Sequence, residues 1–124
     1  MTLALSACEK ADLWDFDYPK DVLCGGTWSG YELKLKGEWV DITRQEYKDL
    51  QFTISFKTDG TYYGTGYFGT GSGTYEAHGK TIKTYVDGEM LYIYTVKSMS
   101  GDIAEITMTS PGSTTSLEFR VKKK

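Results

Sequence analysis

The stretch between residues 51 and 76 limits what this chain can fold into more than any other part of the sequence. It opens with alternating apolar and polar side chains (FTISFK, residues 52–57), which is the period of a strand with one buried face. Asp59-Gly60 follows, and this pair tolerates the positive φ angles of a two-residue hairpin turn. Residues 61–68 are therefore expected to return antiparallel beside the first strand, and residues 73–77 to form a third strand after a glycine-rich corner.

Short strands and tight turns continue along the rest of the chain. Ten Tyr, five Phe and three Trp among 124 residues also favour sheet over helix, since aromatic side chains fit a pleated surface. About eight or nine such strands, joined by tight turns, predict an all-β antiparallel up-and-down barrel that closes on itself. The further strands are predicted over residues 26–35, 38–43, 80–86, 90–98, 103–109 and 115–122, with turns at Asp87-Gly88, Gly101-Asp102 and Pro111-Gly112 and one helical turn over residues 46–50.

The size and charge of the chain narrow the classes of partner. At 124 residues it has the size of one domain, which we expect to be monomeric. The net charge is -3 and the acidic groups are dispersed, so the sequence offers no electrostatic basis for binding a polyanion. We therefore expect no nucleic-acid partner.

The first residues have the features of a targeting signal. Residues 1–7 (MTLALSA) are apolar and small, and Cys8 follows them directly. Leu5-Ser6-Ala7-Cys8 resembles the bacterial lipobox, in which small residues admit the signal peptidase and the cysteine thiol receives diacylglycerol. The resemblance implies that residues 1–8 are a signal-peptide remnant, with the rest of the signal further upstream, and that lipidated Cys8 anchors the protein in the bacterial cell envelope, on the periplasmic or cell-surface face of the outer membrane. The alternative is an apolar N-terminus with a free thiol.

Residues 9–22 separate the lipobox from the first barrel strand. They are acidic and show no clean period, so they are interpreted as a spacer between the anchor and the folded domain. Trp14, Phe16 and Tyr18 are too apolar for a pure linker. We therefore expect part of this segment to lie against the barrel or to close one of its ends.

A resemblance to a known family begins at Gly26-Thr27-Trp28. Gly-x-Trp at the start of the first barrel strand resembles the lipocalin signature. Together with the Asp59-Gly60-Thr61 turn and the Gly73-Thr74-Tyr75 strand, it is similar to the small lipocalin-like domains of Bacteroidetes lipoproteins over residues 23–122. The resemblance implies structural roles for Gly26 and for Trp28, which would close the barrel floor with Arg120 stacked over its ring. The chain lacks the Thr-Asp-Tyr motif and the long open-end loop of true lipocalins.

The interior of such a barrel is either open or filled. If it is open, the domain would bind a small apolar or aromatic ligand, with the glycines at 64 and 66 leaving room on the inner wall. If the aromatic side chains fill it, the protein is a non-catalytic structural or interaction module of an envelope lipoprotein. The side chains predicted to line the ligand site are Trp28, Tyr67, Tyr75, Tyr85 and Tyr94.

The sequence contains no motif that predicts catalysis, a cofactor or a metal. Residues 64–69 match G-x-G-x-x-G, but no helix is predicted after them to meet a pyrophosphate. Cys24 and His78 belong to no nucleophile motif, and the aspartates at 12, 15 and 17 have no EF-hand spacing. We therefore expect a protein that binds rather than catalyses, with no catalytic residue, no cofactor and no metal.

Overall fold

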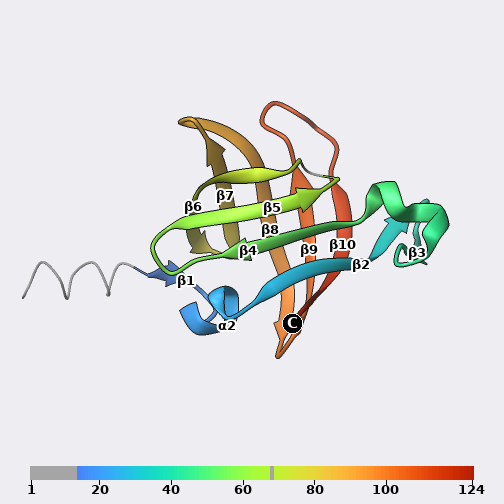
Figure 1. Ribbon diagram of the computed structural model, residues 1–124, viewed down its shortest axis with the longest axis horizontal. Helices are drawn as coiled ribbons and strands as arrows, with labels where there is room; N and C mark the ends of the chain where they lie inside the picture. The colour runs from blue at the N-terminus through green and yellow to red at the C-terminus, as the bar shows by residue number, and fades with distance from the viewer. Residues whose placement is uncertain (1–13, 68) are drawn as a thin grey trace, which may run out of the picture.

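The computed structural model describes residues 14–67 and 69–124, and these residues form an antiparallel β-barrel (Figure 1). Eight strands close the barrel, and two short strands pair with its members β6 and β2. The all-β, up-and-down barrel predicted from the sequence is confirmed. The elements are β1 (Asp15–Phe16), α2 (Lys20–Cys24), β2 (Thr27–Leu35), β3 (Glu38–Asp41), the 3-10 helix η1 (Gln45–Leu50), β4 (Phe52–Phe56), β5 (Thr61–Gly66), β6 (Gly71–Gly79), β7 (Thr81–Val86), β8 (Glu89–Ser100), β9 (Ile103–Thr109) and β10 (Leu117–Lys123).

Each strand from β4 to β9 pairs with the strand that follows it in the sequence, so that the series runs from β4 to β10. The circle closes because β2, the first barrel strand, lies between β4 and β10. Phe119 of β10 stands opposite Leu33 of β2, and Lys123 stands opposite Trp28. Every described barrel strand therefore has a neighbour on both sides, which protects the sheet from pairing with other chains.

Asp87-Gly88 forms a two-residue turn, but the prediction of a two-residue turn at Asp59-Gly60 is wrong. The loop there has three residues, 58–60, because the Lys57 amide donates to the Thr61 carbonyl at 2.8 Å, and Asp59 does not have a positive φ angle. Asp87 and Gly88 connect β7 to β8, and their φ angles are 53° and 82°. Two successive positive φ angles define a type I′ turn, whose twist matches that of the flanking strands. Gly60, in the turn between β4 and β5, has a φ angle of 91°. The two hairpins that sequence pattern predicted around these turns are present.

Strand β2 changes its partner halfway along its length. It pairs with β4 through residues 27–29 and with β3 through residues 32–35. Ile42 spans the resulting fork: its amide donates to the Tyr31 carbonyl at 3.0 Å, and its fully buried side chain packs in the core. The Gln51 side-chain amide donates to the Ile42 carbonyl at 2.9 Å, so this glutamine joins the start of β4 to the end of β3.

The segment before β2 packs across one end of the barrel. β1 runs parallel to β6, with Asp15 opposite His78, and the Phe16 side chain is buried. The short helix α2 places Leu23, which is 1 % exposed, in the core. Part of the predicted spacer therefore lies against the barrel, as its aromatic residues suggested, and the packed domain begins before the predicted boundary at residue 23. Cys8 and the lipobox lie outside the described residues.

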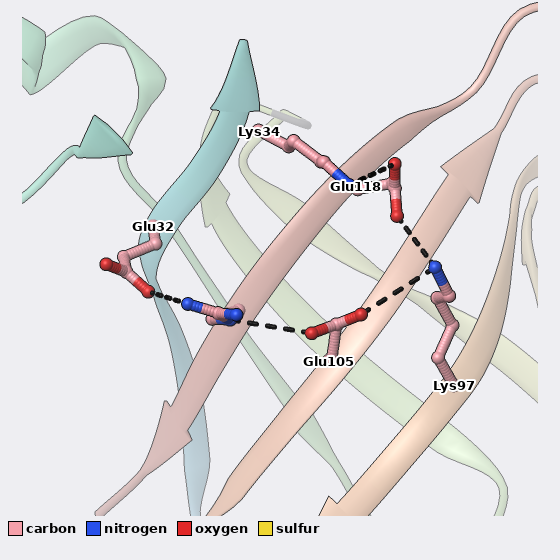
Figure 2. Close-up of polar contacts among 6 residues, drawn as sticks. Glu32, Lys34, Lys97, Glu105 and Glu118 are labelled. Atoms are coloured by element: carbon pink, nitrogen blue, oxygen red, sulfur yellow. Dashed lines mark hydrogen bonds and ion pairs between the residues drawn. The ribbon is translucent and has the colours of Figure 1, made fainter. Parts of the chain in front are cut away.

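Ion pairs connect neighbouring strands on the outer face of the barrel (Figure 2). The Lys97 ammonium on β8 lies 2.8 Å from a Glu118 carboxylate oxygen on β10 and 3.7 Å from Glu105 on β9. The Arg120 guanidinium lies 2.8 Å from Glu32 on β2 and 3.5 Å from the same Glu105. Lys97 and Arg120 each bridge two carboxylates on different strands, and Lys34 on β2 pairs with Glu118 at 3.8 Å. Because all of these groups are partly exposed, the network fixes strand register more than it adds stability.

Candidate functional site

The two ends of the barrel are built differently. The end that we call the closed end carries α2 and the turns at 57–60, 80 and 101–102. Trp28 is 4 % exposed there, and its indole nitrogen donates to the Leu23 carbonyl at 3.0 Å. The opposite end, which we call the mouth, carries η1 and the segments that follow β5, β7 and β9. Helix α2 covers the first end, so access to the interior is expected at the mouth.

Side chains fill the barrel between its closed end and its middle. A void of only about 30 Å³ remains among residues that include Trp28, Ile54, Tyr94 and Val96. Phe119 is fully buried and meets the Phe52 ring edge to face, with 4.9 Å between ring centroids. A void of this size holds about one water molecule, so the deep interior has no room for an organic ligand.

A larger cleft opens at the mouth between β5, β6, β7 and β8. Its volume is about 270 Å³, and we call it the apolar cleft. Glycine at position 64 leaves space on the β5 wall, and the glycine-rich segment 69–72 forms the rim. None of the described residues that line it carries a carboxylate, imidazole or ammonium group. The larger side chains of its wall are Ile54, Tyr62, Val86, Leu91, Tyr92 and Tyr94.

Burial holds two tyrosines of the apolar cleft, Tyr62 and Tyr94, in their neutral form. Tyr94 is 3 % exposed, and burial strongly raises the pKa of its phenol. Burial also raises the pKa of Tyr62, while a hydrogen bond with Thr84 offsets part of that rise. Thr84 is itself buried and is satisfied by the backbone of Tyr92, donating to its carbonyl at 3.1 Å and accepting from its amide at 3.2 Å. The floor of the cleft is therefore uncharged at physiological pH.

A second cleft lies at the mouth between β8, β9 and β10. Its volume is about 410 Å³, and we call it the hydroxyl cleft, because four of its lining residues are Ser or Thr. Ser113 fixes the loop beside it, because its hydroxyl accepts from the Thr115 amide at 3.2 Å. Met108 and Leu117 form its inner wall. Tyr92 lines both clefts and so lies between them. The four hydroxyl-bearing residues are Thr109, Ser110, Ser113 and Thr115.

The five aromatic residues predicted to line one ligand site lie in different places. Tyr94 lines the apolar cleft, whereas Trp28 lies at the closed end. Tyr75 also lies toward the closed end, where its hydroxyl donates to the Lys57 carbonyl at 2.7 Å and lies 3.3 Å from the Cys24 sulfur. Burial and the Cys24 thiol raise the pKa of Tyr75. Tyr75 therefore ties the hairpin turn to α2 rather than lining the clefts at the mouth.

The other two predicted residues do not point into the interior. Ile82 and Thr84 are the inward residues of β7, so Tyr85 faces outward, and its hydroxyl lies 3.1 Å from Glu76. Tyr67 follows the end of β5, is 45 % exposed and stands at the rim of the hydroxyl cleft. The prediction of a single aromatic inner wall was therefore wrong for Tyr85, because a buried threonine takes the inward position beside it.

The predicted stacking of Arg120 over Trp28 was also wrong. Phe119 and Val121 point inward, so Arg120 points outward, where its Cζ atom lies 4.0 Å from the centroid of the Trp39 ring on β3. Lys123 takes the place over Trp28, with its ammonium nitrogen 5.4 Å from the ring centroid. Gly26 lies where β2 starts against the end of β10, and a side chain there would overlap the Lys124 carbonyl. Close approach of two backbones therefore explains this glycine.

Sequence reasoning did not assign Tyr62, Val86, Leu91 and Tyr92 to the site. Tyr62 is two residues from glycine 64 on β5, and Tyr92 is two residues from Tyr94 on β8. Because side chains two residues apart on a strand point to the same face, this spacing alone could have placed both tyrosines on the inner face. Leu91 could not be placed in this way, because the register between β7 and β8 shifts after Thr84.

Comparison of the chain with protein-family models, with curated proteins and with solved structures gave no match. The closed antiparallel barrel is compatible with a lipocalin-like architecture. Within the described ranges, no helix has the length and apolar character to cross a bilayer. In the same ranges, no group of three or more His, Cys, Asp or Glu side chains is placed to hold a metal ion.

Proposed function

We propose that this protein is a monomeric binding protein that holds a small, largely apolar ligand in the apolar cleft. The observation that carries the proposal is an uncharged, mainly apolar cleft of about 270 Å³ at the mouth of a barrel whose deep interior is filled. Ligand sites typically have volumes of roughly 300 to 1,000 Å³, so a cleft of about 270 Å³, just below that range, suits a small molecule. The aromatic walls suit a flat ligand, because offset and edge contacts between rings are favourable.

The composition of the cleft supports binding rather than catalysis. Hydrolysis and group transfer need titratable side chains that converge on a reacting atom and have a pKa suited to the task. The described walls offer phenols, hydroxyls and aliphatic groups, and burial raises the pKa of Tyr94 away from neutrality. Cys24 lies at the other end of the barrel, and burial raises the pKa of its thiol, which disfavours the nucleophilic thiolate.

A fluorescence titration tests the ligand site. Binding of the neutral dye N-phenyl-1-naphthylamine to the full chain is expected to saturate with one dye per protein. Replacing Gly64 by Leu fills the cleft, because a Cβ atom there meets only atoms at 3.5 Å or more. We expect Gly64→Leu to weaken dye binding about tenfold or more without loss of stability. Tyr63→Leu is the matched control, since Tyr63 is on the same strand but 45 % exposed on the outer face. Equal affinity in both variants would place the dye elsewhere.

We further propose that a lipid on Cys8 tethers the barrel to the bacterial cell envelope. The support is the sequence Leu5-Ser6-Ala7-Cys8, which precedes the described residues. A multiply acylated cysteine is stably membrane-bound, because each buried methylene contributes about 0.8 kcal/mol. Expression of the complete gene with labelled palmitate is expected to label the protein and its Cys24→Ser variant, but not a Cys8→Ser variant. Label that persists in Cys8→Ser would contradict the anchor.

A second candidate function is a structural or interaction module with a filled barrel. The void of about 30 Å³ in the deep interior favours it. The two candidate functions differ in whether the mouth of the barrel binds a small molecule. If no compound from a panel of neutral apolar and aromatic molecules binds saturably, this second function replaces the first.

A further inference from the structure

The mouth of the barrel offers two chemically different clefts that meet at one side chain. Tyr92 lines both the apolar cleft and the hydroxyl cleft, and it is the one described residue that the two linings share. Both clefts open at the same end of the barrel, because their walls belong to the ends of β5, β7 and β9 and the starts of β6, β8 and β10. A molecule that passes Tyr92 would contact an apolar wall with one half and hydroxyl groups with the other.

The hydroxyl cleft is suited to a polar group that both donates and accepts hydrogen bonds. Each serine or threonine hydroxyl has one donor and two acceptor positions. Ser113 and Thr115 use part of this capacity on each other, with 3.1 Å between their hydroxyl oxygens, and so hold the loop in place. The Tyr67 ring stands at the rim with 45 % of its surface exposed. An exposed ring beside hydroxyl groups is an arrangement that can stack against the apolar face of a sugar ring while its hydroxyls are bonded.

The charges around the two clefts disfavour an ionised ligand. None of the described residues that line either cleft is a carboxylate or a cation. Next to Val86 in the wall of the apolar cleft, the β7–β8 turn carries Asp87 and β8 begins at Glu89, and both of these acidic side chains are exposed. An anionic group in these clefts would lose hydration without gaining a counter-charge, which is costly even in a partly open site. The ligand is therefore expected to be uncharged in both of its halves.

We propose that the two clefts together bind a neutral glycoside, with its apolar aglycone in the apolar cleft and its sugar in the hydroxyl cleft. This inference rests on the proposed function, because it requires the apolar cleft to bind. The volumes of the two clefts agree with this assignment. The apolar cleft has about 270 Å³ for the aglycone, and the more polar hydroxyl cleft has about 410 Å³ for the sugar. Tyr92, shared by both clefts, would contact the glycosidic linkage.

Three naphthyl probes with one apolar body and different polar groups test the proposal. Calorimetric titration of the full chain would compare 2-naphthol, 2-naphthyl β-D-glucopyranoside and 2-naphthyl β-D-glucuronide at pH 7. The glucuronide differs from the glucoside by a carboxylate, so the pair isolates the effect of charge. We expect the glucoside to bind about tenfold more tightly than either of the other probes. A glucoside no tighter than 2-naphthol, or a glucuronide as tight as the glucoside, would overturn the proposal.

Variants separate the contributions of the two clefts, and they separate binding in the apolar cleft from binding of the sugar. Gly64→Leu is expected to weaken 2-naphthol and the glucoside alike, whereas Tyr67→Ala is expected to weaken only the glucoside, about threefold or more. Tyr63→Ala is the matched control for Tyr67→Ala, because both tyrosines are 45 % exposed. If 2-naphthol binds and the sugar adds nothing, the proposed function stands and this inference fails. If neither the three probes nor N-phenyl-1-naphthylamine binds, both fail.

Discussion

At the scale of the residue, the glycines of this barrel serve different purposes that sequence alone does not separate. Glycine 30 on β2 lies against the Phe52 ring, so that a side chain there would overlap the ring atoms. Glycine 64 on β5 lines the apolar cleft, and a Cβ atom there would meet its nearest neighbours at 3.5 to 3.9 Å, which are ordinary contact distances. Gly66 has a φ angle of 90°, and a Cβ atom there would overlap the Gln51 carbonyl. Glycine 30 therefore allows close packing, glycine 64 leaves room in the cleft, and Gly66 allows a turn.

Alanine substitutions distinguish the packing glycine from the cavity glycine. Gly30→Ala is expected to lower the free energy of unfolding by about 1 to 3 kcal/mol, because the added methyl group forces the Phe52 ring from its place. Gly64→Ala is the matched control and is expected to leave stability unchanged or raise it by about 0.5 kcal/mol, because alanine restricts the unfolded chain. Urea unfolding of both variants measures the difference. Equal stabilities would contradict the packing role of Gly30.

At the scale of the element, the sequence predicts the strands and turns well and the inner faces less well. The predicted strand over residues 103–109 coincides with β9, and the other predicted strands from residue 80 onward end within a few residues of β7, β8 and β10. Strands and turns are predicted well because alternating apolar and polar residues, and turn sequences such as Asp-Gly, depend only on neighbouring residues. The inward positions depend on packing partners from distant strands. Thr84 is buried because its hydroxyl is satisfied by the Tyr92 backbone, and this partner lies on another strand.

The fork in β2 gives a prediction at the same scale. Gln51 donates a hydrogen bond to the Ile42 carbonyl across the gap between β3 and β4. Gln51→Ala is expected to lower the free energy of unfolding by about 1 to 2 kcal/mol, because it leaves that carbonyl without its partner. Gln45→Ala is the control, since Gln45 is exposed at the start of η1. A loss of less than about 0.5 kcal/mol in Gln51→Ala, or an equal loss in both, would show that the fork is held in another way.

At the scale of the whole molecule, burial of several phenol and thiol groups is expected to lower the free energy of unfolding at high pH. Burial raises the pKa of Tyr94, Tyr75, Tyr62 and Cys24 in the folded state. The ordinary values are 10.0 for tyrosine and 9.0 for cysteine, so the unfolded chain releases these protons at a lower pH than the folded one. The unfolded state then binds fewer protons, and stability falls as pH rises. The contribution of these groups is fully present below about pH 9 and is lost progressively as pH rises through the ordinary values of 9.0 for Cys24 and 10.0 for the tyrosines toward the raised pKa values of the folded state.

Chemical denaturation at pH 8 and at pH 10.5 measures this effect. The free energy of unfolding is expected to be lower at pH 10.5, and the difference is expected to shrink in Tyr94→Phe, which lacks one buried phenol. Tyr63→Phe serves as the control, because its phenol belongs to an exposed side chain. A pH dependence that is the same in the parent and in Tyr94→Phe would show that Tyr94 is not the source.

The pairing of β10 with β2 also decides when the barrel can form during protein synthesis. The amide of Lys124 donates to the Thr27 carbonyl at 3.0 Å, so residues at opposite ends of the barrel sequence are direct neighbours. A chain emerging from the ribosome exposes β2 first and must wait for β10 before the circle can close. Contacts between such distant residues are slow to form, because a long loop has to be closed before they contribute. A chain halted before β10 would have two open strand edges, and chaperones would meet it in that open form.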